Sequence, residues 1–417
     1  MVTLKFLFYV ANVTDTVTLA GKGVPGILNY RLFILALGTF AIGTEGFMIA
    51  GVLPMLAQDL RVSLPAAGQL VTVFSLAYAA GSPLLAMATG RVERRALFIG
   101  SLLLFALANV LCGMASHYGM LLSGRVLAAI GAALFVPAAS TAAAGLVAPE
   151  HRGKALAVVI GGQTVALAMG VPLGTWVAYT FHWRTTFWMV GILALIAAAL
   201  VRWRFPVIDA AATVRLRDRL APLRSPAIWT ALLTTVCWGT GAFAVYTYIA
   251  DVFGRLGATP RTISLVLLIW GVSSLVGSTV GGFAADRFGA ARTIPLTLVA
   301  LLAALASLSV LASGQPPRQA LAIGIAAMAV WGVSAWAFNP AQQHRLIGLS
   351  GKAAGLVVSL NPSAIYLGSA LGAAIGGLAV SYGNVAELGY IGGVCELLAL
   401  GAFAASRVRE RRTATAE

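Results

Sequence analysis

Residues 32–56 read LFILALGTFAIGTEGFMIAGVLPML and contain a single charged side chain, Glu45. A helix needs about 20 consecutive apolar residues to cross the hydrocarbon core of a bilayer. This stretch is therefore long enough to span a membrane, and its carboxyl group would lie inside the span. Leu56 lies eleven positions after Glu45, so the acid lies roughly 16 Å from that end of the helix at ~1.5 Å per residue.

Eleven further stretches have the same character. Of the 417 residues, 59% are hydrophobic and 10% are charged, whereas soluble proteins carry about 25% charged residues. The composition therefore excludes an ordinary soluble protein and predicts an all-α membrane protein with twelve transmembrane helices. The other spans are predicted at 67–88, 96–115, 119–147, 155–179, 184–203, 227–252, 262–285, 293–313, 319–343, 352–380 and 385–406.

The spans divide into two groups of six. We expect an N-terminal six-helix bundle at 31–203 and a C-terminal six-helix bundle at 227–406, joined by an arginine-rich linker at 204–226. Residues 1–30 contain an apolar run too short for a span and no cleavage-site pattern, so they are expected to be a mobile N-terminal tail. Residues 407–417 are expected to be a C-terminal tail.

The basic residues lie unevenly between the two sides of the predicted membrane. The chain has 28 Lys and Arg, 13 Asp and Glu and a formal charge of +15; 22 of the 28 basic residues fall on the side of both termini, and five fall on the other side. Short cytoplasmic loops hold the excess of Lys and Arg, so both tails and the linker are predicted to be cytoplasmic. The charge then faces anionic lipid headgroups, and a nucleic-acid partner is not expected.

The two groups of helices also repeat one another. Gly43, Thr44 and Phe47 recur as Gly239, Thr240 and Phe243, which is a constant offset of 196 positions. Later matches, from Gly153 and Gly170 to Gly351 and Gly368, have an offset of 198. Because each half has an even number of spans, the halves are parallel repeats related by an axis along the membrane normal. Such an arrangement favours alternating access to a cavity between two rocking bundles.

The motifs resemble a known family. The loop after the eighth span reads GFAADRFGAAR at 282–292, and Arg125 lies early in the fourth span; with the six-plus-six arrangement, these features resemble the major facilitator superfamily over residues 30–406. GTEGFMIAGVLP at 43–54 and GVPLG at 170–174 are similar to the twelve-helix drug:proton antiporters. The pattern is most similar to arabinose-efflux-like and chloramphenicol-resistance permeases of bacterial inner membranes.

The resemblance implies a function. It implies a multi-pass secondary transporter of the bacterial inner membrane that exports a small, lipophilic, drug-like molecule in exchange for protons, as a monomer and without a cofactor. Its partners would be the substrate, protons and the lipid bilayer. A sugar or nucleoside exporter of the same fold is the alternative. The sequence offers no phosphate-binding loop ending in Lys-Ser or Lys-Thr and no metal-ligand spacing, which disfavours an ATP-driven pump and an enzyme.

The chain departs from the family pattern in three places. Gly90 stands where the repeat places the counterpart of Asp286, with Glu93 as the nearest substitute. Ala128 and Ala129 replace the Gln and Gly that usually follow the arginine of the fourth span. In the fifth span, Val171 separates the Gly and Pro that the antiporter signature usually joins directly.

Glu45 and Arg125 are the candidates for proton coupling. A charge in mid-membrane costs at least ~2.5–3.5 kcal/mol, so a charged residue inside a span is expected to have a functional or structural role. Burial disfavours the charged form of a carboxyl group and a nearby arginine favours it, so a change in their separation would move a proton on or off Glu45. The alternative is a fixed structural ion pair. Glu396, in the last span, is expected to be structural or partly lipid-facing.

Two further groups of residues are assigned by resemblance. The residues of a cytoplasmic gate are Gly282, Asp286, Arg287, Arg91 and Arg94, whose alternative role is a solvated turn. The antiporter motif of the fifth span comprises Gly162, Gly170, Pro172 and Gly174, which would give that helix a small-residue face and a break; the alternative is ordinary tight packing.

The substrate cavity is assigned to the C-terminal half because that half is rich in aromatic residues and an aromatic, mostly apolar cavity suits a lipophilic molecule. Aromatic side chains at the membrane surface are the alternative interpretation. The cavity candidates are Trp238, Phe243, Tyr246, Trp331 and Asn361.

Overall fold

The computed structural model describes residues 30–148, 151–207, 225–313, 318–350 and 354–414. Within these ranges the chain forms helices and no strands, and twelve helical segments are long and apolar enough to cross a membrane. The prediction of an all-α fold with twelve transmembrane helices is confirmed. The predicted N-terminal tail and most of the predicted linker lie outside the described residues.

The helices fall into two groups in chain order. The first group comprises α2 (Tyr30–Asp59), α3 (Leu64–Ala88), α4 (Arg94–Gly113), α5 (Tyr118–Gly145), α6 (Arg152–Val165), η2 (Ala166–Gly170), α7 (Val171–Thr180) and α8 (Trp183–Arg204). The second comprises α10 (Pro226–Tyr246), α11 (Ile249–Arg255), α12 (Pro260–Phe288), α13 (Ala290–Ala312), α14 (Ala320–Ser350), α15 (Ala354–Tyr382), η5 (Val385–Glu387) and α16 (Leu388–Ala414). The segments α6, η2 and α7 together make the fifth span.

Local sequence explains where several helices begin. The Ser63 hydroxyl accepts a hydrogen bond from the Ala66 N–H at 3.3 Å before the first turn of α3, and Thr259 caps α12 in the same way. Proline is tolerated in the first turn, where the N–H groups have no partner within the helix, and Pro260 starts α12. Between α12 and α13, Gly289 has φ of 80°, a conformation that favours glycine because it has no Cβ.

Two helices differ from the sequence prediction, one by an internal break and one by its length. The predicted span at 227–252 is interrupted at Thr247–Tyr248, between α10 and α11. At this break the Tyr248 hydroxyl donates a hydrogen bond to the Ala373 carbonyl of α15 at 3.1 Å. At the other end of the chain, α16 continues to Ala414, so the segment predicted as a tail from residue 407 begins inside a helix.

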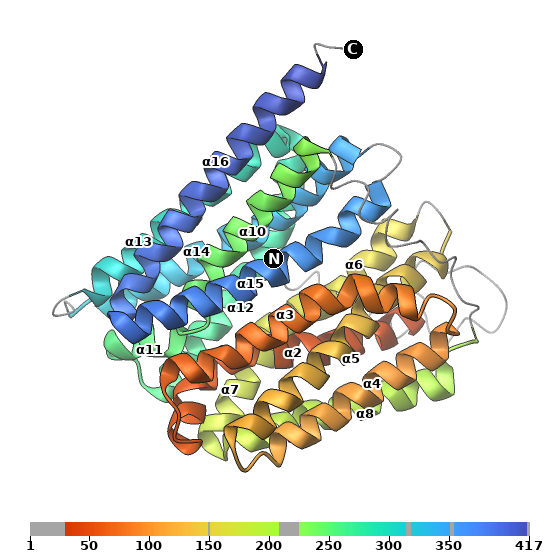
Figure 1. The fold of residues 1–417 in the computed structure, drawn as a ribbon, viewed down its shortest axis with the longest axis horizontal. Helices are drawn as coiled ribbons and strands as arrows, with labels where there is room; N and C mark the ends of the chain where they lie inside the picture. The colour runs from red at the N-terminus through yellow and green to blue at the C-terminus, as the bar shows by residue number, and fades with distance from the viewer. Residues whose placement is uncertain (1–29, 149–150, 208–224, 314–317, 351–353, 415–417) are drawn as a thin grey trace, which may run out of the picture.

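The packing of the first six-helix bundle is repeated in the second (Figure 1). In the N-terminal bundle α2 packs on α6, α3 on α5, and α4 on α8. The matching contacts in the C-terminal bundle are α10 on α15, α12 on α14, and α13 on α16. The repeat seen in the sequence is therefore also a repeat of helix contacts.

The two bundles meet mainly through the middle and one end of the molecule. Tyr30, the 89–93 loop and Ala414 lie at one end, which we call the basic end, and the 60–63 and 181–182 loops lie at the opposite end. Between the bundles, α3 packs on α15, and α12 packs mainly on η2 and α7 rather than on α6. Since α6 forms the part of the fifth span nearest the basic end, the bundles hold together more closely toward the opposite end.

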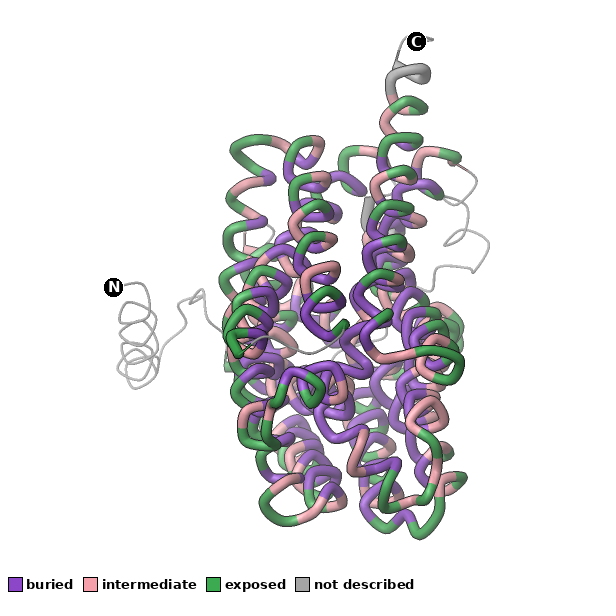
Figure 2. Tube along the Cα trace, turned by 90° about the vertical axis from the view of Figure 1, so that its left-hand side faces the viewer, coloured by how far each residue is buried: buried purple, intermediate pink, exposed green. Residues whose placement is uncertain are grey.

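Burial follows the pattern expected for a protein in lipid (Figure 2). Buried residues lie where helices face one another, and the exposed positions include many large apolar side chains, such as Leu107, Met169 and Leu296 at 62%, 65% and 71% exposure. A soluble protein of this size rarely exposes so much contiguous apolar surface. These outward faces are therefore suited to contact lipid.

Candidate functional site

Glu45 and Arg125 form an ion pair inside the N-terminal bundle. Glu45 comes from the middle of α2 and Arg125 from α5, both side chains are fully buried, and the Nη1 group of Arg125 donates to Oε1 of Glu45. The Nε of Arg125 donates to the Leu70 carbonyl of α3 at 3.2 Å, and its guanidinium carbon lies 4.2 Å from the centre of the Phe74 ring. The structure thus brings together the two residues that the sequence singled out.

The surroundings of this pair leave each partner incompletely satisfied. Oε2 of Glu45 and Nη2 of Arg125 have no hydrogen-bond partner among the described residues. Ala128 and Ala129, which follow Arg125 on α5, are buried and offer no polar side chain. Because an uncompensated buried charge is costly, the two side chains depend on each other for stabilisation.

The small residues of the fifth span hold it against α2. A Cβ atom on Gly162 would lie 2.3 Å from the Ala36 carbonyl oxygen, and one on Gly170 would lie 2.0 Å from the Thr44 hydroxyl. A Cβ on Gly174 would lie 3.0 Å from the sulfur of Met48. These distances exclude any larger side chain at Gly162 and Gly170. Gly170 contacts Thr44, which directly precedes Glu45 in α2.

Between Gly162 and Gly174 the fifth span contains one π-helical turn, η2, which ends at Gly170 directly before Val171 and Pro172. Proline lacks the N–H that would continue the hydrogen-bond ladder, and π-turns occur where a helix must accommodate such an irregularity. On its other side, η2 faces α12, where a Cβ on Gly271 would lie 2.1 Å from the Leu167 carbonyl oxygen. The turn therefore contacts both bundles.

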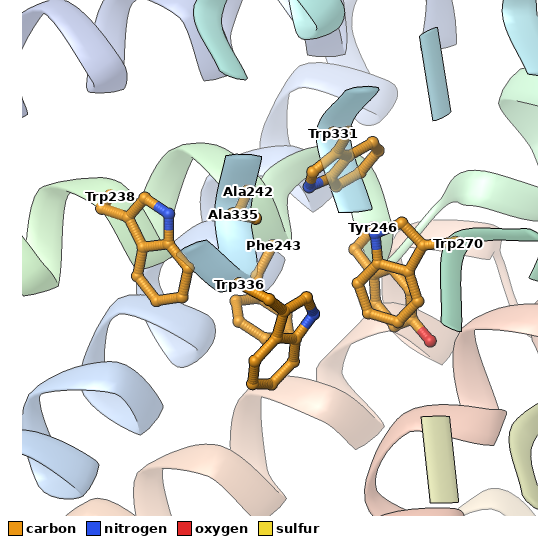
Figure 3. Close-up of a pocket in the computed structure, with 8 residues that line it drawn as sticks. All are labelled: Trp238, Ala242, Phe243, Tyr246, Trp270, Trp331, Ala335 and Trp336. Atoms are coloured by element: carbon orange, nitrogen blue, oxygen red, sulfur yellow. The ribbon is translucent and has the colours of Figure 1, made fainter. Parts of the chain in front are cut away.

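An aromatic pocket lies in the C-terminal bundle, next to its contact with α2 (Figure 3). The space inside it that a water molecule could enter is only about 10 Å³, so the side chains almost fill it. Its rings pack closely, with Tyr246 and Trp270 centred 4.4 Å apart and Trp238 stacked on Phe338 at 4.9 Å. The lining residues are Trp238, Ala242, Phe243, Tyr246, Trp270, Trp331, Ala335 and Trp336.

Phe47 of α2 joins this aromatic cluster from the N-terminal bundle. Its ring centre lies 6.0 Å from that of Phe243 and between 6.1 and 6.5 Å from those of Tyr246, Trp270 and Trp336. The Tyr246 hydroxyl also donates a hydrogen bond to the Phe47 carbonyl at 3.1 Å. Since Phe47 is two residues from Glu45, α2 connects the ion pair directly to the pocket.

Four of the five cavity candidates line the pocket, and Asn361 does not. Its side-chain oxygen accepts a hydrogen bond from Thr235 at 3.0 Å, and Thr235 in turn accepts one from Gln342 at 3.1 Å. Asn361 therefore belongs to a separate buried polar cluster. Trp270 and Phe47 are not among the residues predicted from sequence, although Phe47 is the repeat counterpart of Phe243 and that relation points to it.

The predicted gate residues lie at the basic end of the molecule, without ion pairs between them. Asp286 and Arg287 at the end of α12 are exposed, as is Arg91, and no salt bridge among the described residues includes any of them. Gly282 and Arg94 are partly exposed. The assignment of a gate to these residues stays a prediction.

Glu93, considered as a substitute for the missing aspartate, has a local structural role. Its carboxylate oxygens accept hydrogen bonds from the backbone N–H groups of Arg95 at 2.7 Å and Ala96 at 2.9 Å. Glu93 thus caps the N-terminus of α4, where the N–H groups of the first turn lack partners within the helix.

Glu396 is fully buried between α16 and α10 and does not face lipid. A Cβ on Gly241 would lie 2.7 Å from one carboxylate oxygen of Glu396. Neither carboxylate oxygen has a hydrogen-bond partner among the described residues. Because Gly241 is the repeat counterpart of Glu45, the carboxyl group of Glu396 occupies the place where a side chain at that position would lie.

Comparisons with known proteins agree with this arrangement. The family model described as "Major Facilitator Superfamily" matches residues 35–373. The chain is 34% identical to the inner membrane transport protein YdhP of Escherichia coli (strain K12) over 87% of this chain and 91% of that protein, and 37% identical to a chloramphenicol resistance protein of Streptomyces lividans over 61% and 67%. The crystal structure of the nucleoside transporter NupG has a TM-score of 0.73 at 12% identity, covering 91% of this chain and 99% of that one.

Proposed function

The chain belongs to the major facilitator superfamily of transporters, and on this premise we propose that it exports a small lipophilic molecule in exchange for protons. The observation that carries the proposal is the connection through α2 between a buried ion pair and an aromatic pocket. Glu45 pairs with Arg125 in one bundle, and Phe47, two residues later, enters the aromatic cluster of the other bundle.

Proton binding and bundle movement are coupled in this proposal through the position of α2. A proton on Glu45 removes its negative charge and weakens its attraction to Arg125. Arg125 retains the Leu70 carbonyl and the Phe74 ring, while α2 is released from α5. A shift of α2 would then move Phe47 relative to Phe243 and Tyr246 and change the space available to a substrate.

The direction of access follows from the charge distribution. By the positive-inside rule the basic end faces the cytoplasm, and the bundles hold together more closely toward the opposite end. The structure thus supports a state that receives its substrate from the cytoplasm. In the opposite state, Asp286 and Arg287 would meet partners across the cytoplasmic mouth and keep the bundles closed there.

The chemistry of the pocket supports a lipophilic substrate rather than a sugar or nucleoside. All eight lining residues are aromatic or alanine, and the one hydroxyl among them, on Tyr246, already donates to the Phe47 carbonyl. The remaining polar groups of the lining are indole N–H donors, whereas the hydroxyl groups of a sugar or nucleoside also need acceptors to which they can donate. The chloramphenicol resistance of a relative agrees with the same substrate class.

Transport in proteoliposomes with an imposed pH gradient tests the proposal, with chloramphenicol as the first probe. Glu45→Gln, which keeps the shape of the side chain but cannot release a proton, is expected to lose gradient-driven uptake by at least about tenfold and to retain exchange of labelled for unlabelled probe. Glu387→Gln, at an exposed acid, is the matched control and should behave as the wild type. Unaltered gradient-driven uptake by Glu45→Gln would contradict the proposed role of Glu45.

A further inference from the structure

The pocket presents an unusual set of hydrogen-bond donors. The indole N–H groups of Trp238, Trp270, Trp331 and Trp336 are buried, and none of the four has an acceptor among the described residues. The side chains of the first three are almost completely buried, at 3%, 3% and 1% exposure. Folded proteins pair nearly all such buried polar groups, so four unpaired donors around one pocket require an explanation.

Another buried tryptophan in the same protein shows the ordinary arrangement. Trp183 is fully buried in the N-terminal bundle, and its indole N–H donates to the Asp59 carboxylate at 3.0 Å. Tryptophan in this chain therefore finds an acceptor where the surrounding helices offer one. The four pocket tryptophans come from α10, α12 and α14, and these helices supply no acceptor to them.

The electrostatics of the pocket distinguish between kinds of aromatic ligand. An aromatic ring is negative on its faces and positive at its edge, and an indole N–H adds a donor to that edge. In Figure 3 the nitrogen atoms of Trp238, Trp331 and Trp270 lie on the ring edges that are turned toward the space between these residues. The lining contains no carboxylate, so a cation would meet positive ring edges without a counter-charge.

We propose that this pocket recognises neutral aromatic molecules that carry hydrogen-bond acceptors, such as carbonyl or nitro groups, through the indole N–H groups of Trp238, Trp270 and Trp331. The proposal rests on the proposed function, because it names the substrate class of the same site. The acceptor satisfies donors that the protein leaves unpaired, and the rings of the pocket contact the aromatic part. Lipophilic cations are disfavoured.

The size of the pocket links this recognition to the other bundle. Its open space of about 10 Å³ is far below the ~300–1,000 Å³ of sites that hold drug-sized ligands, so the pocket is closed in this state. Phe47 occupies the edge of the same aromatic cluster. Withdrawal of Phe47 would enlarge the pocket, so a ligand of this class would replace Phe47 as the partner of the surrounding rings.

Equilibrium binding of two probes of matched shape tests the proposal. Benzophenone has a carbonyl acceptor, and diphenylmethane has the same two rings without it. Calorimetry on the full chain in lipid nanodiscs, with empty nanodiscs as the blank, should show benzophenone binding about three- to tenfold more tightly, as expected for a neutral hydrogen bond. The doubly substituted Trp270→Phe/Trp331→Phe protein, which keeps aromatic rings and removes two donors, should bring the two affinities within about twofold.

Trp229→Phe, on α10 but at a half-exposed position outside the pocket, is the matched control and should keep the wild-type ratio. Unchanged diphenylmethane binding by the double variant verifies that its pocket is intact. The proposal is wrong if the double variant keeps the full benzophenone preference, if the wild type does not bind benzophenone, or if tetraphenylphosphonium binds more tightly than benzophenone. These binding measurements use no proton gradient. The proposal about ligand recognition can therefore be contradicted while proton-driven transport is observed, and proton-driven transport can be absent while the binding preference is observed.

Discussion

The two bundles share a backbone arrangement and differ in the chemistry of corresponding positions. At an offset of 196 residues, Glu45 corresponds to Gly241 and Phe74 to Trp270, while Phe47 corresponds to Phe243. In the N-terminal bundle Glu45 and Phe74 both contact Arg125, whereas in the C-terminal bundle Trp270 lines the aromatic pocket. At corresponding backbone positions the repeat thus places a charged pair in one half and an aromatic pocket in the other.

The one pair in this comparison that keeps its residue type lies where the halves touch. Phe47 and Phe243 are repeat counterparts and contact each other, with ring centres 6.0 Å apart. Residues related by a pseudo-twofold axis can meet only close to that axis. The contact therefore places the junction between the two chemistries at the centre of the molecule, where a movement of either bundle changes it.

The largest expected effect comes from removing the positive charge of the N-terminal bundle. Arg125→Leu would leave Glu45 buried without its partner, and breaking a buried pair in this way costs about 3–5 kcal/mol of stability. Thermal unfolding in detergent measures the loss. Arg184→Leu breaks the Arg184–Asp59 pair, whose side chains are 30% and 36% exposed, and should cost less than about 1 kcal/mol.

The double variant Glu45→Gln/Arg125→Leu tests the difference between the bundles directly. It removes both charges, so that the N-terminal bundle carries no charge at the position where the C-terminal bundle has none. It should recover most of the stability that Arg125→Leu loses and still fail in proton-driven transport. Recovery of transport together with stability would show that the pair has only a structural role.

A smaller loss is expected from adding a side chain at the counterpart of Glu45. A Cβ on Gly241 would lie 2.7 Å from both the Glu396 carboxylate and the Gly392 carbonyl oxygen, so Gly241→Ala forces α10 and α16 apart and should cost about 1–3 kcal/mol. Gly46→Ala is the control, since its nearest neighbour would lie at 3.9 Å. Equal melting temperatures for the two variants would contradict the close packing at Gly241.

The smallest effect is expected at Glu396. No counter-cation or hydrogen-bond donor faces its carboxyl group among the described residues, so we expect the acid to remain neutral and to serve packing between α10 and α16. Glu396→Gln should therefore keep gradient-driven transport within about twofold of the wild type in proteoliposomes. A tenfold loss would show that the C-terminal bundle has an acid of its own in the proton pathway.

The sequence predicted the spans and the ion pair well, for a physical reason. A span must be long and apolar, and a charge inside one is rare enough to attract attention, so Glu45 and Arg125 are visible without a structure. The sequence does not show in the same way which face of each helix is turned toward the other helices. In lipid the outward face of a helix is as apolar as its inward face, and the exposed Leu107 and Leu296 resemble buried leucines in sequence.

Because apolar faces do not distinguish inside from outside, the sequence could not predict several features of the pocket and of the helices around it. Nothing in the apolar run around Trp270 distinguishes a ring that lines a pocket from one that faces lipid. Asn361 was assigned to the cavity because an amide deep in a span suggests a ligand, whereas Thr235 in a neighbouring helix binds it. The break at Thr247–Tyr248 depends on a contact with α15 that is distant in sequence.

The π-turn of the fifth span has a consequence for how the chain tolerates insertions. An α-helix rotates by about 100° per residue, so eight residues of regular helix would turn Gly170 roughly 80° away from the direction of Gly162. Both glycines nevertheless face α2, because the wider turn at 166–170 absorbs one residue. The additional Val171 between Gly170 and Pro172 is thereby accommodated without rotating the helix. Deletion of one residue from this turn would restore a regular α-helix and leave Gly170 and Gly174 directed at α2, whereas a second insertion would turn them away.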